Sequence, residues 1–359
     1  MQYTNPDLKF NSVPPSGEIG WKSPSNIALI KYWGKKGNQI PQNPSLSFSL
    51  NKAHTQTTVQ YRPAKGNKFS VDFLLNGKTN AAFGEKTTSF FKSLSEVFPF
   101  IRQLDFTIHS ENTFPHSAGI ASSASGMSAL ALTLCDLERT YFHQINDIDF
   151  FQKASFLARL GSGSACRSVY GGYTIWGETQ AQNNTTNLYA VPVKGKVHPE
   201  FQHFQDTILL VETGAKKVSS RAGHALMNNH PFATERFGQA RENLKILLTA
   251  LQSGDLETFI RITESEALTL HAMMMTSNPS FLLMKPETLQ IISKIQEFRM
   301  STGTPVCFTL DAGPNVHMLY PLSAKELVHD FLNQELSKHT GNRGWIEDEL
   351  GEGPQKITS

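Results

Sequence analysis

The stretch that decides the fold lies at residues 114–126 and reads Phe-Pro-His-Ser-Ala-Gly-Ile-Ala-Ser-Ser-Ala-Ser-Gly. It runs directly into residues 122–141, whose apolar spacing predicts a helix. Small residues let backbone N–H groups approach a ligand closely, and a helix N-terminus carries a partial positive charge. The stretch therefore suits a phosphate group. Alternatively, its serines only cap a closely packed helix.

Two common nucleotide-binding motifs are missing from the sequence. The stretch does not read GxxxxGK(S/T), and the fingerprint GxGxxG occurs nowhere in the chain. Walker-type and Rossmann-type nucleotide binding are therefore unsupported.

The segments on either side alternate between strand and helix patterns. Residues 1–20 are expected to form an irregular lead-in, and the polar residues 179–205 a linker. The expected strands lie at residues 44–62, 68–75, 104–109, 171–178, 207–211, 306–311 and 316–320, and the expected helices at residues 85–98, 122–141, 147–160, 165–170, 235–252, 256–271, 287–300 and 324–336. The second half mixes strands and helices without regular strand–helix–strand alternation, which predicts α+β packing.

Length, charge and cysteine content exclude several classes of protein. The chain has 359 residues, which predicts two domains. Its net charge of +2 gives no global field to hold nucleic acid, so an anionic ligand needs a local cationic cluster. No stretch approaches the roughly 20 apolar residues of a membrane span, and no secretory signal is visible. The widely spaced Cys135, Cys166 and Cys307 predict neither a disulfide framework nor a metal site and favour a cytoplasmic location.

The first of three further segments is residues 23–36, which read SPSNIALIKYWGKK. An apolar strand carries Lys31 into a turn that carries Lys35, and both lysines could face one pocket if the chain bends at Gly34. Two solvated lysines at a strand end are the alternative. Lys31 is embedded between Ile30 and two aromatic residues, which favours the pocket.

The second segment is residues 161–168, which read GSGSACRS and lie between two expected helices. The guanidinium of Arg167 is a planar fork that suits a carboxylate, and the neighbouring serines add hydroxyl groups. The anionic partner is either a ligand or a protein carboxylate in a structural salt bridge. No serine lies in a GxSxG elbow, and Cys166 is interpreted as a small packed residue.

The third segment is residues 308–315, which read FTLDAGPN. Asp311 follows an apolar strand and precedes a tight Gly-Pro turn, a place from which side chains project into clefts. Alternatively, Asp311 only forms the turn.

Together these segments resemble the mevalonate diphosphate decarboxylase family of the GHMP kinase superfamily. The resemblance is carried by NIALIKYWGKK at 26–36, PQNPSLSFSL at 41–50, FPHSAGIASSASG at 114–126, ARLGSGSACRSVYGGY at 158–173 and DAGPN at 311–315, with weaker matches at 216–224 and 352–355. Residues 219–224 read SSRAGH where family members often have SST-GM.

The resemblance implies the α+β GHMP kinase fold. An N-terminal ribosomal-S5-like domain is expected at residues 1–198 and a C-terminal ferredoxin-like domain at residues 199–359. The active site is expected in the cleft between them.

The resemblance also implies a reaction and its partners. With ATP and Mg²⁺ as cofactors, mevalonate 5-diphosphate is phosphorylated on its 3-hydroxyl and then loses phosphate and CO2 to give isopentenyl diphosphate. The protein is expected to form a homodimer, and no nucleic-acid or membrane partner is expected.

Each motif then implies roles for residues of this chain. Asp311 would orient or deprotonate the 3-hydroxyl, Lys31 would neutralise charge beside it, and Arg167 would hold the substrate carboxylate. The implied substrate-binding residues are Asn26, Tyr32, Lys35, Ser162, Ser164 and Arg167, the implied ATP-binding residues are Pro115, Ser117, Ala118, Gly119, Ala121, Ser122, Ser123 and Ala124, and the implied magnesium ligand is Ser123.

Three alternatives remain open from the sequence. A decarboxylase of mevalonate 5-phosphate needs fewer diphosphate contacts, and the presence of Tyr32 and Lys35 favours the diphosphate. A 3-kinase without decarboxylation would be expected to lose the set of Asp311, Lys31 and Arg167. A catalytically inactive binding homologue has no reason to keep that set.

Overall fold

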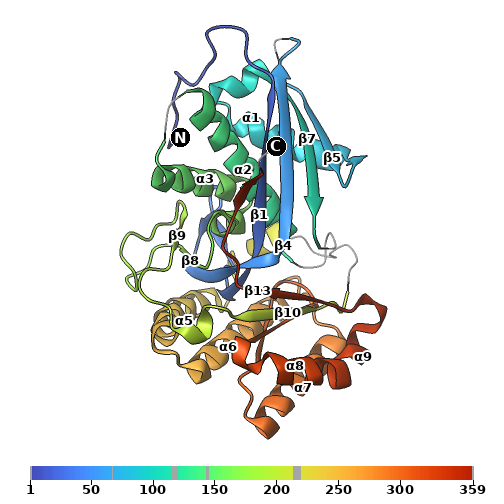
Figure 1. Cartoon of the computed structure of the whole chain (residues 1–359). Coiled ribbons are helices and arrows are strands. Elements are labelled where there is room, and N and C mark those ends of the chain that lie inside the picture. Colours follow the sequence, from blue (N-terminus) through green and yellow to red (C-terminus); the bar gives the residue numbers. More distant parts are fainter. Residues whose placement is uncertain (1, 67, 115–119, 143–144, 213–219, 358–359) are drawn as a thin grey trace.

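The computed structural model describes residues 2–66, 68–114, 120–142, 145–212 and 220–357. These residues form two halves, each built on its own β-sheet (Figure 1). In the part of the chain so described, no helix combines the length and the apolar character needed to cross a bilayer.

The N-terminal half is built on an eight-stranded sheet in the order β14-β1-β4-β7-β5-β6, with β8 and β9 extending from β4. Its strands are β1 (Gly17–Ile30), β4 (Ser45–Pro63), β5 (Val71–Leu75), β6 (Lys78–Thr79), β7 (Leu104–Asn112), β8 (Tyr173–Trp176), β9 (Ala190–Pro192) and β14 (Gln355–Ile357). Every pairing is antiparallel except that of β5 with β7. This arrangement agrees with the absence of a Rossmann motif, because a Rossmann sheet is mostly parallel.

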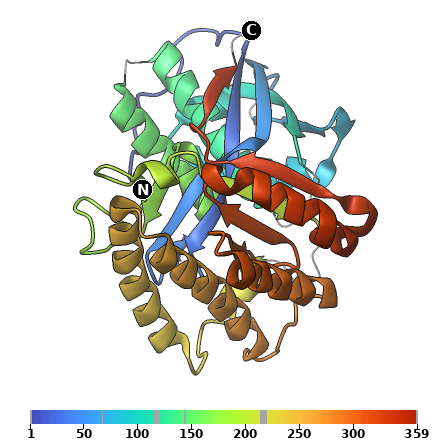
Figure 2. The same cartoon turned by 60° about the horizontal axis from the view of Figure 1, so that its bottom comes forward.

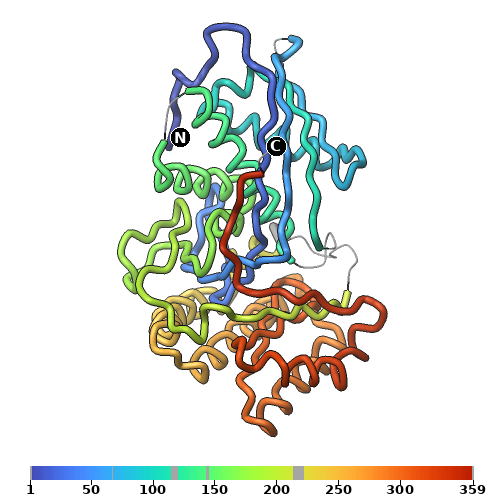
Figure 3. The backbone as a smooth tube through the Cα atoms, viewed as in Figure 1, coloured from blue at the N-terminus to red at the C-terminus, as the bar shows by residue number. Residues whose placement is uncertain are grey.

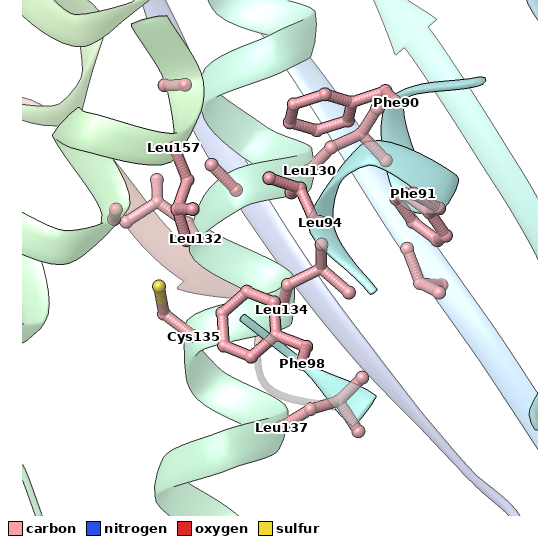
Figure 4. Close-up of a cluster of buried hydrophobic side chains, with 14 of the residues drawn as sticks. Phe90, Phe91, Leu94, Phe98, Leu130, Leu132, Leu134, Cys135, Leu137 and Leu157 are labelled. Carbon is pink, nitrogen blue, oxygen red and sulfur yellow. The ribbon is translucent and has the colours of Figure 1, made fainter. Parts of the chain in front are cut away.

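Three helices cover the large sheet: α1 (Ala81–Leu94), α2 (Ser122–Tyr141) and α3 (Asp147–Gly161). The side chains of Asn80 and Asn146 accept backbone N–H groups at the starts of α1 and α3, which satisfies donors that the helix leaves unpaired. Leucines of α2 interleave with phenylalanines of α1 and with Leu157 of α3 in a buried cluster (Figure 4). This packing fixes the N-terminus of α2, which begins at Ser122.

The C-terminal half is built on a four-stranded antiparallel sheet in the order β11-β12-β10-β13. Its helices gather at one end of the molecule (Figure 2). The strands are β10 (Gln205–Leu209), β11 (Cys307–Leu310), β12 (Val316–Tyr320) and β13 (Trp345–Glu349), and the helices are α4 (Ser220–Ala225), α5 (Ala233–Ser253), α6 (Leu256–Met275), α7 (Pro286–Thr302), α8 (Lys325–Phe331), continued by a π-helical turn (Leu332–Leu336), and α9 (Ser337–Thr340).

The two halves share one hydrophobic core. Ile27 and Phe48 of the large sheet pack in the same buried cluster as Leu247 of α5 and Phe259 of α6. Beyond β13, the chain returns to the N-terminal half, where β14 pairs with β1 (Figure 3). Apolar burial and strand pairing therefore hold the halves in one relative position.

The predicted α+β class is confirmed, and the helix predicted at residues 122–141 has those bounds. Three expectations are wrong. The irregular lead-in ends early, because β1 already begins at Gly17. The polar linker contains β9, and the strands β13 and β14 were not expected. Strand β13 is rich in charged residues and β14 is only three residues long, so neither shows the apolar alternation that identifies a strand in a sequence.

Candidate active site

Lys31 and Asp311 form an ion pair between the two halves of the molecule. Lys31 follows β1 and Asp311 follows β11, so the ends of two strands meet. The Lys31 Nζ lies 3.3 Å from the Asp311 Oδ1, with side-chain exposures of 2% and 27%. Burial lowers the pKa of Lys31, whereas the negative charges of Asp311 and Glu266 act in the opposite direction. The carboxylate is thus partly open to a ligand, with a buried cation directly behind it.

The main chain of Lys31 is held by a buried group of polar side chains. The carboxylate of Glu266 accepts the Lys31 N–H at 2.9 Å, and Asn43 donates to the Lys31 carbonyl oxygen at 3.0 Å. Glu266 also pairs through both oxygens with the guanidinium of Arg236, at 2.8 and 2.5 Å, and accepts from Asn243 at 2.7 Å. Helices α5 and α6 therefore set the position of a residue in the N-terminal half.

Sequence reasoning missed Glu266, Arg236 and Asn243. All three lie on helices that were predicted, at residues 235–252 and 256–271, and all are buried. A charged residue on the apolar face of an expected helix is a signal for a buried partner. The sequence alone does not say which residue that partner is.

Arg167 is buried, and its side-chain hydrogen-bond partners are neutral. It lies in a 3-10 turn (Gly163–Val169) and is 3% exposed. Its Nε donates to Asn26 Oδ1 at 3.2 Å and its Nη1 to Ser45 Oγ at 2.5 Å. Among the described residues, no carboxylate lies within ion-pair distance of Arg167, and burial lowers its pKa. The described residues therefore do not supply the structural salt bridge that the sequence left open for Arg167. The partner that its guanidinium lacks is an anion.

Asn26 and Ser164, both expected near the substrate, lie beside Arg167. The Asn26 amide donates to the carbonyl oxygen of Ser164 at 3.3 Å and to Ser168 Oγ at 2.8 Å. These bonds fix the amide so that its oxygen faces the guanidinium. Cys166, in the same turn, is fully buried, and burial raises its pKa to about 12, which fits the interpretation of a packed thiol.

Tyr32 and Lys35 follow Lys31 along the chain. The Tyr32 ring lies between Trp176 and His224, with ring centroids 4.6 and 4.2 Å away. The Tyr32 hydroxyl is buried and has no hydrogen-bond partner among the described residues. The Lys35 ammonium donates to Gln39 Oε1 at 2.8 Å, within a short hairpin formed by β2 (Lys35–Lys36) and β3 (Ile40–Pro41). An unsatisfied buried hydroxyl suits a ligand oxygen.

The start of α2 lies beside the turn that carries Arg167. The hydroxyl oxygens of Ser123 and Ser162 are 3.4 Å apart, and Ser123 is exposed. Ala121, which precedes α2, has a left-handed backbone with φ of 38°, whereas Ser122 begins the helix and Ala124 is buried. The expected ATP contacts at Pro115, Ser117, Ala118 and Gly119 lie outside the described residues.

His271 of α6 holds the main chain of Asp311. Its Nε2 donates to the Asp311 carbonyl oxygen at 3.1 Å, and the ring is 1% exposed. Burial lowers the pKa of His271 to about 4, and the positive charge of Lys31 acts in the same direction. The imidazole is therefore neutral at ordinary pH, which keeps a second positive charge away from the Lys31–Asp311 pair.

Two family models match this chain. The diphosphomevalonate decarboxylase-like N-terminal domain matches residues 23–187, and the mevalonate 5-diphosphate decarboxylase C-terminal domain matches residues 207–355. The chain is similar to the diphosphomevalonate decarboxylase of Saccharomyces cerevisiae, with 31% identity over 85% of this chain and 78% of that protein. The enzyme of Aspergillus fumigatus is 30% identical over 89% and 80%.

Solved structures agree with these relatives. Mevalonate diphosphate decarboxylase from Staphylococcus aureus superposes with a TM-score of 0.82 and 31% identity, covering 96% of this chain and 99% of that one. A structure described as MDDEF in complex with MVAPP, AMPPCP and magnesium has a TM-score of 0.81 and 28% identity, covering 96% and 100%.

We expect Glu266→Gln to lower the free energy of unfolding by about 3 kcal/mol, because it leaves the buried Arg236 charge without its partner. The measurement is chemical denaturation followed by circular dichroism. Glu235→Gln, an exposed change on the same pair of helices, is the control and should have little effect. Equal stability of both variants would contradict the role given to the buried pair.

We expect stability to fall as the pH drops from about 6.5 toward 4, because the unfolded His271 then binds a proton that the folded residue excludes. At about pH 5 this costs about 2 kcal/mol. His271→Gln should lose about 2 kcal/mol less than the wild type between neutral pH and about pH 5. Denaturation at both pH values measures the difference.

The control for this pH series is His203→Gln, because His203 is exposed. It should lose as much stability as the wild type on acidification. A wild-type pH dependence in His271→Gln would show that His271 is not held neutral.

Proposed function

The chain belongs to the diphosphomevalonate decarboxylase family, and we propose that Asp311, Lys31 and Arg167 carry out its reaction. The fold is that of the GHMP kinases. The chain is an ATP-dependent decarboxylase that converts mevalonate 5-diphosphate to isopentenyl diphosphate. In this reaction the 3-hydroxyl takes the γ-phosphoryl group of ATP, after which phosphate and CO2 leave.

The observation that carries the residue assignment is the buried Arg167 with only neutral hydrogen-bond partners among the described residues. A buried cation is costly unless an anion approaches it, and the planar guanidinium matches a carboxylate in shape. The C1 carboxylate of mevalonate is such an anion. Asn26 and Ser45 hold the guanidinium in one orientation before the substrate binds.

Asp311 and Lys31 would act at the 3-hydroxyl. The Asp311 carboxylate is exposed enough to accept the hydroxyl proton, which makes the oxygen a better nucleophile toward the γ-phosphorus. The Lys31 ammonium, 3.3 Å away, would offset the negative charge that develops there. Glu266 and Arg236 hold Lys31 from behind, and His271 holds Asp311. The pair is therefore set in place before catalysis.

The phosphate groups would lie toward the outer residues of the site. Tyr32, with its unpartnered hydroxyl, and Lys35 would bind the 5-diphosphate, together with the hydroxyls of Ser162 and Ser164. The start of α2, with Ser122 and Ser123, would face the ATP phosphates.

ATP and Mg²⁺ are the cofactors of the reaction. The described residues contain no cluster of three or more His, Cys, Asp or Glu side chains that could hold a metal ion. They do offer the exposed Ser123 hydroxyl, and Mg²⁺ is commonly bound through few protein oxygens plus substrate phosphates. The residues thus fit Mg²⁺ as a partner of the ATP phosphates, whose charge it neutralises.

Arg167 should position the carboxylate rather than bind it tightly. The carboxylate loses its charge as CO2 leaves, so strong stabilisation of the bound substrate would slow this step. Holding the C–C bond in line with the departing phosphate speeds it instead.

We expect Arg167→Gln to lower kcat by about 100-fold or more while the Kd for ATP changes less than about twofold. Steady-state kinetics and nucleotide titration measure the two quantities. Arg343→Gln, an exposed change of the same kind, should leave both unchanged. Equal losses of turnover and of ATP binding would refute the assignment of Arg167 to the carboxylate.

An assay that measures ADP and CO2 together tests the function itself. With mevalonate 5-diphosphate and ATP, the wild type should release the two products in equal amounts, and with mevalonate 5-phosphate it should release far less. ADP without CO2 would identify a kinase, and release of neither product would identify an inactive homologue. Preference for the monophosphate would move the substrate assignment to the sister activity.

We also propose that the enzyme works in the cytoplasm and as a homodimer. The location is supported by three cysteines that are all free and buried, as expected in a reducing compartment. The dimer follows from the family resemblance, and sedimentation equilibrium of the purified chain tests it. The division into domains at residues 198 and 199 remains a proposal as well, with β14 returning to the sheet of the first half.

A further inference from the structure

His224 of α4 touches three successive residues of the segment that follows Lys31. Its ring centroid lies 4.2 Å from that of Tyr32 and 4.7 Å from that of Trp33. Its Nδ1 accepts the backbone N–H of Gly34 at 3.0 Å. His224 is buried, with 7% of its surface exposed.

The turn at Gly34 depends on contacts from the C-terminal half. Gly34 has φ of +98°, and a Cβ atom there would lie 2.8 Å from the ring of Phe237 on α5. The Trp33 ring packs closely over Gly223, the neighbour of His224, where a Cβ would lie 2.5 Å from it. The backbone that leads from Tyr32 to Lys35 is therefore shaped by groups from α4 and α5.

The charge state of His224 makes this contact possible. Burial lowers the pKa of His224 to about 3, and the positive charges of Lys35 and Arg167 act in the same direction. The neutral ring keeps a lone pair on Nδ1 for the Gly34 N–H and carries its hydrogen on Nε2. A protonated ring would offer no acceptor to Gly34 and would add a third cation beside Lys35 and Arg167.

We propose that His224 is a positioning residue that holds Tyr32 and the turn carrying Lys35 where they bind the diphosphate end of the substrate. The inference rests on the proposed assignment of Tyr32 and Lys35 to the diphosphate. His224 supplies two separable features, a flat ring for the stack with Tyr32 and Trp33 and an acceptor atom for Gly34.

Two substitutions separate these features. His224→Phe keeps a flat ring and removes the acceptor, whereas His224→Asn keeps an acceptor near the place of Nδ1 and removes the ring. We expect His224→Phe to raise the KM for mevalonate 5-diphosphate about 10-fold, the effect of one lost hydrogen bond. The kcat and the KM for ATP should stay within about twofold, because the lost contact serves substrate and transition state equally. His224→Asn should recover part of the lost affinity.

A second readout compares two substrates. The ratio of kcat/KM for mevalonate 5-diphosphate to that for mevalonate 5-phosphate should fall in His224→Phe. The reason is that the weakened contacts, those of Tyr32 and Lys35, would bind the outer phosphate, which only the diphosphate has. A general loss of packing would lower both values together. The matched control is His230→Phe, because His230 is also 7% exposed but bonds to the Met273 carbonyl oxygen and lies beside Thr276. This control should keep the wild-type ratio.

Several results would overturn the proposal. One is a wild-type KM and ratio in His224→Phe; another is a parallel rise in the KM for ATP. If thermal melting shows that His224→Phe does not fold, a wild-type KM and ratio in His224→Ala, which lacks both the ring and the acceptor, overturns it. A wild-type enzyme that releases no CO2 overturns the proposed function and this inference together, whereas an active wild type with an unchanged His224→Phe overturns only the inference.

Discussion

The candidate site depends on keeping Lys31 buried beside the carboxylate of Asp311. Lys31 is 2% exposed, and a charge in such a place is stable only with close partners. Asp311 meets its ammonium, while Glu266 and Asn43 hold its main chain. Because Glu266 is itself buried, it needs Arg236. A series of compensating charges therefore runs from the Lys31–Asp311 pair into the core of the C-terminal half.

This chain of contacts gives the two-half architecture a function. The Asp311 carboxylate follows a strand of one sheet and Lys31 follows a strand of the other, so neither half contains the ion pair alone. The shared apolar core of Ile27, Phe48 and Phe259 and the return of β14 to β1 hold the two strand ends together. Burial of apolar surface here stabilises the chain and also sets a distance of 3.3 Å between two charged atoms.

The site concentrates positive charge in a protein whose net charge is only +2. The charge of Arg167 acts on Lys31, and the charges of Lys35 and Arg167 both act on His224. Burial lowers the pKa values of His224 and His271 to about 3 and about 4. Neutral imidazoles can accept or donate hydrogen bonds without adding to the repulsion among the cations. The same burial that keeps them neutral also fixes their rings, which suits His224 to hold the turn at Gly34 and His271 to hold the main chain of Asp311.

The sequence by itself determined the α+β class and the helix at residues 122–141, and it singled out Lys31, Arg167 and Asp311 as candidates, because glycine and serine turns with embedded charges are local patterns. Only the tertiary structure decided which groups meet: Glu266 and Arg236 with Lys31, 235 and 205 positions away in the chain, and His224 with the turn at Gly34, 190 positions away. Strands β13 and β14 could not be predicted from the sequence either. They are strands because they pair with β10 and β1, and their own residues carry no strand pattern. Local propensity acts over a few residues, whereas a buried charge finds its partner wherever the folded chain brings one.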